Sequence, residues 1–392
     1  MTSRPSTRPY PSFEDRPILL VHAPERGRRL LEQLRTLRPH FVCTVAHTET
    51  ADIDGISGAG VTAELRRLTA AADTEALFHG RPLCMDGVPS NPGGAPGPVL
   101  ITLAGLRLTG MTFAVIDAGL RVKPDAPTIQ VADRWGESIV TGRAVPHAGA
   151  LFQRGLDMAA SLVSGAGYLV LAESVPGGTT TALSLLCGLG IDARGKVSSS
   201  MPGNAHPLKE QIVQQALAAA GLTGQPPTVP ALDVAAAVGD PMQPFVAGLA
   251  LGALPTVPVL LAGGSQMAAV LALIVALAQE RGQSLDLDRL GIATTSWVAR
   301  DPTADLAGLV DQIADVPVFA SGLDFSESRH LPLRRYEDFL VKEGVGAGAA
   351  AVVAALQTDV DHARLLSTIE AVYEEIYGLE SSIERGPNAA PS

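Results

Sequence analysis

The sequence is poor in cysteine, histidine motifs and aromatic residues, and these shortages exclude several classes of function. Its 392 residues include only three cysteines, Cys43, Cys84 and Cys187, an odd number without CxxC spacing. Neither a disulfide framework nor a zinc site is therefore indicated, and a reducing cytoplasm is the expected location. The eight histidines show no HxH or HExxH spacing. We therefore expect no metal and no cofactor.

Positive charge and long apolar runs are also scarce. The formal net charge is -11, which argues against non-specific binding to nucleic acid or to an anionic membrane. A phosphate on a substrate must then be held locally, by backbone amides and a few cations. The most apolar region, 246–278, is broken by glycines and prolines before it reaches the roughly 18 residues of a membrane span. The basic N-terminus is followed by no apolar stretch, so we expect no secretory signal.

The residues that are abundant indicate a globular α/β protein. Hydrophobic residues make up 46%, and Gly 40 and Pro 29 are both high, which suits close packing around buried parallel strands. Short apolar runs predict strands at Ile18–His22, Val99–Leu103, Phe113–Ile116, Tyr168–Ala172, Val257–Ala262 and Gly291–Thr294. Longer runs predict helices at Ala182–Leu189, Leu208–Ala220, Ser265–Glu280 and Ala347–Gln357. The alternation predicts a mainly parallel sheet with flanking helices, a Rossmann-like three-layer fold, with ligands at the carboxyl ends of the strands.

Composition also suggests the domain limits. Residues 1–16 are rich in Pro, Ser and Arg and predict a disordered arm, and 379–392 predict a disordered tail. Between them we expect a single domain, 17–378. Its core would span about 95–357, and a smaller lobe would come from 17–94 and 358–378. The loop Ser90–Pro98 would mark the boundary between the two.

The first loop that could carry chemistry follows the predicted strand at 168–172. That strand ends at Glu173, glycines Gly177 and Gly178 make a tight turn, and Thr179 and Thr180 open a helix. Free amides at a helix N-terminus, with threonine hydroxyls added, form an anion site. The alternative is an ordinary helix start with a threonine cap and an exposed glutamate.

A second loop, Gly263-Gly264-Ser265, has the same arrangement of glycines between a predicted strand and the predicted helix Ser265–Glu280. Its alternative explanation is stronger, because Ser265 would be an ordinary N-cap. Between these two loops in the sequence, Lys209 is expected in the first turn of a helix, at the unfavourable end of the helix dipole. That position hints at a bound anion, although a solvated lysine is the commoner explanation.

The third loop contains Glu343 within a cluster of glycines. Gly344 and Gly346 would let a substrate approach the carboxylate closely, and partial burial would raise its pKa. That is the environment of a general base. The alternative is a solvated glutamate in a flexible loop.

Taken in order, these segments resemble the nicotinate-nucleotide:dimethylbenzimidazole phosphoribosyltransferases of cobalamin biosynthesis. More closely, they resemble a divergent CobT-like branch found in archaea and cyanobacteria. The resemblance covers roughly residues 151–357. Four blocks of the family are matched. Its loop of an acid followed by Gly-Asn-Thr-Thr is matched by 173–180, and its small-residue helix by 239–252. Its strand end at Asp-Gly-Phe is matched by 262–265, and its closing Gly-Glu-Gly-Thr-Gly-Ala loop by 342–347. The first block here has Pro-Gly-Gly where the family has Gly-Asn, and the third lacks the Asp.

The resemblance implies a role for each site residue. Glu343 would be the catalytic base, and Glu173 would also lie in the pocket. The family holds the substrate phosphate with glycine-rich backbone and a lysine. The residues implied for the phosphate and ribose are Gly177, Gly178, Thr179, Thr180, Lys209, Gly264, Ser265, Ser296 and Gly344.

The resemblance also implies a reaction. Phosphoribosyl would pass from nicotinate mononucleotide to 5,6-dimethylbenzimidazole or a similar aromatic base, and adenine or another azole would fit equally well. No pyrophosphate departs, so no metal is needed to neutralise one. The family forms homodimers, and apolar helices such as Phe245–Leu254 could supply the interface. Two other functions stay open: a non-catalytic nucleotide-binding or regulatory homologue, and a nucleotide N-glycosidase that uses water.

Overall fold

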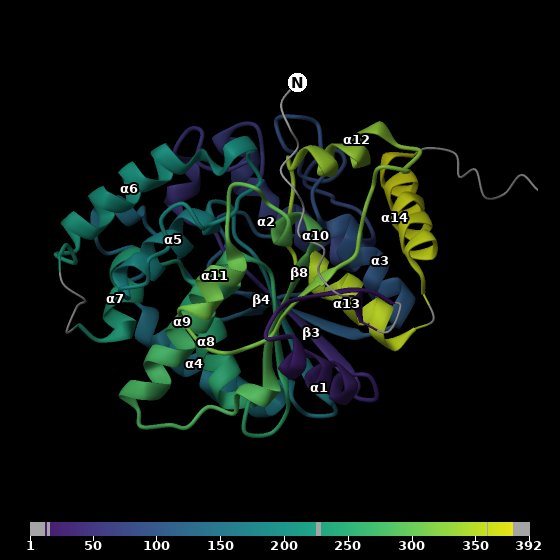
Figure 1. The fold of residues 1–392 in the computed structure, drawn as a ribbon. Coiled ribbons are helices and arrows are strands. Elements are labelled where there is room, and N and C mark those ends of the chain that lie inside the picture. The colour runs from purple at the N-terminus through teal and green to yellow at the C-terminus, as the bar shows by residue number, and fades with distance from the viewer. Residues whose placement is uncertain (1–11, 14–15, 225–228, 359, 379–392) are drawn as a thin grey trace, which may run out of the picture.

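The computed structural model describes residues 12–13, 16–224, 229–358 and 360–378. Their centre is one nine-stranded sheet (Figure 1). In spatial order its strands are β1 (Ser12–Phe13), β2 (Arg16–His22), β9 (Val318–Ser321), β8 (Leu290–Thr295), β7 (Val259–Ala262), β6 (Tyr168–Ser174), β3 (Pro39–Val45), β4 (Thr112–Asp117) and β5 (Ile129–Gln130). Only β2 runs against its neighbours, and the other six strand pairs are parallel. The predicted mainly parallel sheet is confirmed.

The order of the strands reverses at one place in the sheet. From β3 the chain adds β4 and β5 on one side, and then returns to add β6, β7, β8 and β9 on the other. The reversal therefore lies between β3 and β6, which pair directly in parallel. In sheets of this kind, ligands bind in the crevice outside the carboxyl ends of the strands at such a reversal. Glu173 and Ser174 end β6 at this point.

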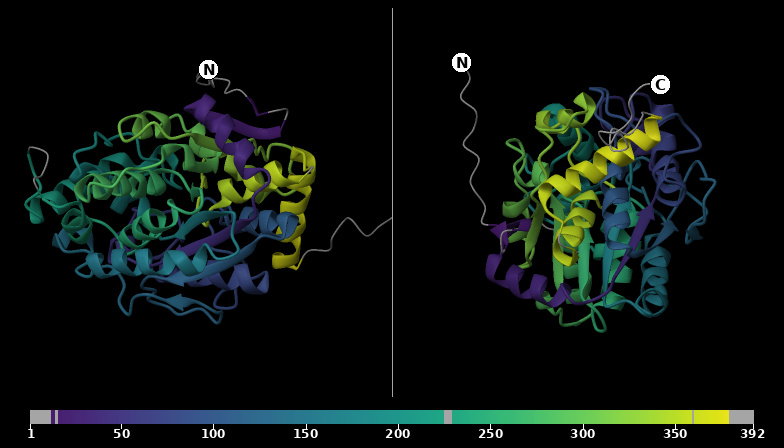
Figure 2. Two further views of the ribbon diagram at one scale, coloured as in Figure 1. Left: turned by 90° about the horizontal axis from the view of Figure 1, so that it is seen from below. Right: turned by 90° about the vertical axis from the view of Figure 1, so that its right-hand side faces the viewer.

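Helices cover both faces of the sheet (Figure 2), and its inner strands contribute residues to two apolar cores. Along β6, Leu169 and Leu171 pack into one apolar cluster, and Tyr168, Val170 and Ala172 pack into the other. This alternation is the period-two geometry of a strand buried on both faces. The three-layer arrangement predicted from the sequence is confirmed.

One face is covered by seven helices that contribute to the first cluster: α4 (Ala148–Leu162), α5 (Gly178–Gly188), α6 (His206–Ala219), α7 (Ala231–Val238), α8 (Met242–Ala253), α9 (Ser265–Glu280) and α11 (Leu306–Asp311). The other face is covered by five: α1 (Pro24–Leu34), α2 (Ala63–His79), α3 (Val99–Thr109), α13 (Ala347–Gln357) and α14 (His362–Tyr377). Two short helices, α10 (Ser296–Ala299) and α12 (Leu331–Arg334), complete the set. Figure 1 shows the C-terminal helices α13 and α14 beside α3, far from them in sequence.

Helix α8 packs against α4 inside the core, where small residues allow close contact. A Cβ added at Gly248 would lie 2.1 Å from the carbonyl oxygen of Phe152. Phe245 and Leu249 are fully buried. The suggestion that 245–254 could supply a subunit interface is therefore wrong, because this segment is already covered within the protomer. The homodimer itself stays a prediction.

Five of the six predicted strands are confirmed within β2, β4, β6, β7 and β8. The prediction of a strand at Val99–Leu103 is wrong, since these residues begin α3. A continuous apolar run does not distinguish a buried strand from a buried helix, and here the run continues to Thr109. Strands β3 and β9 were not predicted.

The predicted arm (1–16) and tail (379–392) lie outside the described residues, except that 12–13 and 16 pair in the sheet. The division into a core and a smaller lobe stays a prediction. The sheet takes β2 and β3 from the N-terminal segment assigned to that lobe. Among the described helices, none combines the length and apolar character needed to cross a membrane.

Candidate active site

The loop from β6 to α5 places Glu173 at the carboxyl end of the sheet. Glu173 is 2% exposed, and its carboxylate accepts a hydrogen bond of 3.0 Å from the amide of Val175. Gly177, at φ 76°, turns the chain into α5, a left-handed conformation that glycine adopts at little cost. No side chain caps α5, so the alternative of a threonine cap with an exposed glutamate does not hold.

Glu343 lies just before the N-terminus of α13. One carboxylate oxygen accepts from the Thr294 hydroxyl at 3.0 Å, and the other accepts from the amides of Gly344 and Gly348 at 3.1 and 3.2 Å. Burial raises the pKa of Glu343 from 4.5 to about 7, although these hydrogen bonds act to lower it. The side chain is therefore held by three donors instead of being freely solvated. A carboxylate with a pKa near neutrality suits a general base.

The close approach of α13 to β8 depends on glycine at position 348. A Cβ there would lie 1.9 Å from the backbone carbonyl carbon of Thr294. Because residue 348 has no side chain, the first turn of α13 can rest on the end of β8. Glu343 thereby reaches both the helix amides and the Thr294 hydroxyl.

Val345 ties the two glutamate loops together. Its amide donates to the backbone oxygen of Glu173 at 2.8 Å, and its own carbonyl accepts from the Thr102 hydroxyl at 2.9 Å. Val345 has φ 54°, a left-handed conformation that costs a β-branched residue about 1–3 kcal/mol. The two hydrogen bonds stabilise this strained backbone conformation. They also fix the position of Glu343 relative to Glu173.

Glu173 and Glu343 also interact electrostatically. Burial raises the pKa of Glu173 to about 8, and the nearby carboxylates of Asp240 and Glu343 add to the rise. A negative charge on Glu343 therefore disfavours the ionised form of Glu173. Near pH 7, Glu173 is mainly protonated and Glu343 is closer to its ionised form.

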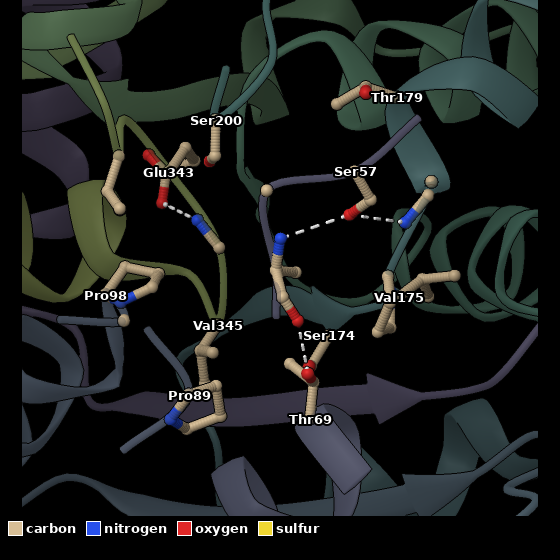
Figure 3. A pocket seen from close by; sticks show the side chains of 18 of the residues that line it. Ser57, Thr69, Pro89, Pro98, Ser174, Val175, Thr179, Ser200, Glu343 and Val345 are labelled. Carbon is tan, nitrogen blue, oxygen red and sulfur yellow. Dashed lines mark hydrogen bonds between the residues drawn. The ribbon is translucent and has the colours of Figure 1, made fainter. Parts of the chain in front are cut away.

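Two neighbouring cavities meet at these glutamates, because both side chains line both cavities. The first holds about 690 Å³ of empty space including its mouth, and the second about 320 Å³. Figure 3 shows Glu343 and Pro98 along one side of the first cavity, and Ser57 and Val175 along the other. Its wall also includes Thr69, Asp73, Pro89, Asn91, Ser174, Gly177, Gly178, Thr179, Val341, Gly344 and Val345.

The second cavity is rich in hydroxyl groups and lies at the N-terminus of α9. Its lining consists of Glu173, Thr179, Ser198, Ser199, Ser200, Gly264, Ser265, Gln266, Val298, Lys342 and Glu343. Ser265 is the first residue of α9, not its N-cap. Its hydroxyl accepts a hydrogen bond of 2.9 Å from the amide of Ser198, which holds the serine loop against the helix. Helix N-termini of this kind attract anions.

Lys342 brings a cation to the second cavity. It is 2% exposed, and its ammonium donates to Asp301 and to Asn204, both at 2.7 Å. Burial would raise the pKa of Asp301, but the charge of Lys342 and several hydrogen bonds lower it overall. The ion pair with Asp301 thus stabilises the Lys342 ammonium inside the protein. Lys342 directly precedes Glu343 in the sequence.

Lys209 is a second buried lysine in this region. It lies in the first turn of α6, is 0% exposed, and donates to the Thr179 hydroxyl at 2.9 Å. Burial, with the positive charge of Lys342, lowers the pKa of Lys209 from 10.5 to about 7. The solvated lysine considered from the sequence is therefore excluded. An anion bound beside it would supply a counter-charge that favours the protonated ammonium.

The structure brings most of the predicted site residues together. Gly177, Gly178 and Gly344 line the first cavity, Gly264 and Ser265 line the second, and Thr179 lines both. Lys209 reaches the site through Thr179.

Besides Lys209, two predicted site residues line neither cavity. The Ser296 hydroxyl donates to the carbonyl of Leu323, and Thr180 is buried within α5. Among the described residues, no group of three or more His, Cys, Asp or Glu is placed to hold a metal ion.

Several lining residues were missed by sequence reasoning. Asp73 lies in an alanine-rich helix segment, and Lys342 directly precedes Glu343. Neither residue belongs to a local sequence motif that indicates a binding site. The loop at 90–98 looked like a linker, but the Asn91 amide donates to the carbonyls of Ser200 and Leu340 at 2.7 and 2.9 Å. Two signals were available: the run of serines at 198–200, since a polar loop before a helix suggests ligand contact, and a weaker family resemblance at 53–62 and 68–80.

Two solved structures resemble this chain in fold over almost its whole length. A crystal structure of nicotinate-nucleotide-dimethylbenzimidazole phosphoribosyltransferase from Thermus thermophilus matches with a TM-score of 0.54 at 17% identity, covering 92% of each chain. A structure of CobT from the same organism matches with a TM-score of 0.55 at 19% identity, covering 91% of this chain and 92% of that one. The fold expected from the resemblance is confirmed. No family model matches the chain.

Sequence relatives place the chain more narrowly. It is 47% identical to a UPF0284 protein of Gloeobacter violaceus, over 90% of this chain and 92% of that protein. It is 44% identical to one of Methanothermobacter thermautotrophicus, over 81% and 87% respectively. A Synechocystis relative is 42% identical over 85% and 90%. The chain therefore belongs to the UPF0284 family, which fits the divergent branch expected from archaea and cyanobacteria.

Proposed function

We propose that this protein transfers the phosphoribosyl group of nicotinate mononucleotide to an aromatic nitrogen base. The products would be an α-ribazole-type phosphate and nicotinate, as in synthesis of the lower ligand of cobalamin. The observation that carries the proposal is the position of the buried Glu173 and the part-buried Glu343, two carboxyls with raised pKa values, where the two cavities meet. The protein would work without a cofactor, in the cytoplasm and as a homodimer.

The two cavities differ in a way that suits the two ends of such a substrate. The second offers serine hydroxyls, the N-terminus of α9 and the Lys342 ammonium, which together favour a phosphate. The first has Pro89, Pro98 and Val345 in its wall, surfaces against which a flat ring packs well. The ribose C1′ would then lie at the junction, beside the glutamates.

The chemistry follows from this placement. A ring nitrogen of the acceptor attacks C1′ from the face opposite nicotinate, and a new C1′–N bond forms with inversion from β to α. The old C1′–N bond breaks, and its electron pair neutralises the cationic pyridine nitrogen. The ring N–H proton of the acceptor passes to Glu343, so that the transferred base ends neutral. Glu173 is mainly protonated near neutral pH and is therefore uncharged. Because it adds no second negative charge near Glu343, Glu343 can ionise and act as the base.

Four of the predicted phosphate and ribose residues have a defined place in this proposal. Gly264 and Ser265 present the N-terminus of α9, and Thr179 is held by Lys209 at the edge of both cavities. Lys342 joins them as a cation absent from the sequence-based set. Ser296 is left out, because its hydroxyl is used by Leu323.

The test compares two isosteric variants that each remove a part-buried carboxyl. Glu343→Gln should lower the turnover of nicotinate mononucleotide about 10²- to 10⁴-fold, the usual contribution of a general base. Calorimetry should show that its affinity for the nucleotide is unchanged within about threefold. Glu337→Gln is the matched control, because the Glu337 carboxylate accepts from Trp297 and Phe325 and lines neither cavity. Full activity in Glu343→Gln, or an equal loss in both variants, would refute the assignment of the base.

A further inference from the structure

A third buried carboxyl, Asp73, lines the first cavity. It lies on α2 and is 4% exposed. One of its oxygens accepts a hydrogen bond of 2.7 Å from the Ser174 hydroxyl. The other, Oδ1, has no hydrogen-bond partner within the described part of the chain. Asp73 lines the first cavity but not the second.

An unpartnered oxygen on a buried carboxyl is unusual, because protein interiors satisfy the great majority of their polar atoms. Asp73 forms no ion pair among the described residues. Burial raises its pKa to about 7, and the Ser174 hydrogen bond only partly offsets that rise. A hydrogen-bond donor on a ligand would satisfy the free oxygen and stabilise the charged form of the side chain.

The position of Asp73 suggests which ligand would bring that donor. Glu343 and Glu173 lie at the junction of the cavities, so the nucleophilic nitrogen of an acceptor would sit there. The rest of the ring would extend into the first cavity, away from the phosphate side. The Thr69 hydroxyl on the same helix is already used, since it donates to the backbone carbonyls of Ala59 and Leu65. Asp73 thus keeps an acceptor oxygen in a wall that otherwise includes proline and valine.

We infer that the acceptor is an azole that carries an amino or hydroxyl donor at the edge away from its attacking nitrogen, and that Asp73 recognises this donor. The inference rests on the proposed function. A ring with methyl groups at that edge would leave the carboxyl oxygen unpaired, and sites built to pair with a donor discriminate strongly against analogues that lack it. Asp73 is therefore a specificity-determining residue, separate from the base Glu343.

The experiment uses three acceptors of nearly equal size: 5-aminobenzimidazole, 5-methylbenzimidazole and unsubstituted benzimidazole. With saturating nicotinate mononucleotide, kcat/KM is measured for each, and the affinity of each base is measured separately by calorimetry. The unsubstituted protein should favour the amino over the methyl compound about 10-fold or more in both measurements. The exposed Glu64 on the same helix provides the control variant Glu64→Gln, which should keep that preference.

In Asp73→Leu the preference should vanish or reverse, with benzimidazole still accepted. Asp73→Asn is the second variant, since its amide oxygen can still accept from Ser174. It should fold like the unsubstituted protein, as checked by thermal melting, and lower the preference. Equal or better use of the methyl compound by the unsubstituted protein, or a preference that survives in both Asp73 variants, would overturn the inference. Binding preference without turnover of any base would refute the proposed function while supporting recognition by Asp73.

Discussion

The buried Glu173 should make the stability of this protein fall as pH rises. Its pKa is raised from 4.5 to about 8 in the folded state, so the folded protein retains a proton that the unfolded chain loses above about pH 4.5. Stability is therefore lost progressively between these two values. At about 1.4 kcal/mol per pH unit, the shift corresponds to roughly 5 kcal/mol when the pH is above 8. The side chain is 2% exposed, so solvent screening reduces this figure little.

The variant Glu173→Gln removes this loss, because glutamine has no proton to release. In urea unfolding at pH 5, 7 and 9, the free energy of unfolding of Glu173→Gln relative to the unsubstituted protein should become more positive with each step. The total gain should be several kcal/mol. Glu32→Gln, at an exposed position of α1, should follow the unsubstituted protein at every pH. Parallel curves for Glu173→Gln and the unsubstituted protein would show that the carboxyl is not buried as described.

Three further predictions concern the neighbouring residues. The kcat/KM for nicotinate mononucleotide should rise with pH through about 7, where Glu343 loses its proton, and a profile flat from pH 5 to 9 would exclude this base. Gly348→Ala should lower the melting temperature by several degrees and abolish turnover, because the added methyl group meets the backbone of β8. Gly149→Ala, where a Cβ has no neighbour within 4 Å, should change neither. Lys342→Met should cost about 3–5 kcal/mol in urea unfolding by leaving Asp301 buried and unpaired, and adding Asp301→Asn should recover most of that loss.

The sequence predicted the sheet well where local pattern and tertiary environment agree. Strand β6 is a continuous apolar run followed by glycines, so both its type and its end were evident. Val99–Leu103 was misassigned, because α3 is buried nearly all round and shows no helical periodicity. Strand β3 was missed because His40, Cys43 and Thr44 interrupt its apolar pattern, although it lies inside the sheet between β6 and β4.

The site was predicted where its residues follow strands in recognisable loops, as Glu173 and Glu343 do. Asp73 could not be found this way, since its role depends on α2 packing beside the end of β6. Lys342 likewise acquires its place only through its contacts with Asn204 and Asp301, which are distant in sequence. Ser296 was assigned by family resemblance alone, and the structure directs its hydroxyl to a backbone carbonyl instead.

The central claim is tested most directly by incubating the purified protein with nicotinate mononucleotide and an azole acceptor and identifying both products. We predict that nicotinate and a ribotide of the base appear in equal amounts, that proton NMR shows the α configuration at C1′, and that little nicotinate is released without the base. Nicotinate release at the same rate without the base, giving ribose phosphate, would contradict transfer and indicate hydrolysis. No release with any acceptor would contradict the enzymatic function itself.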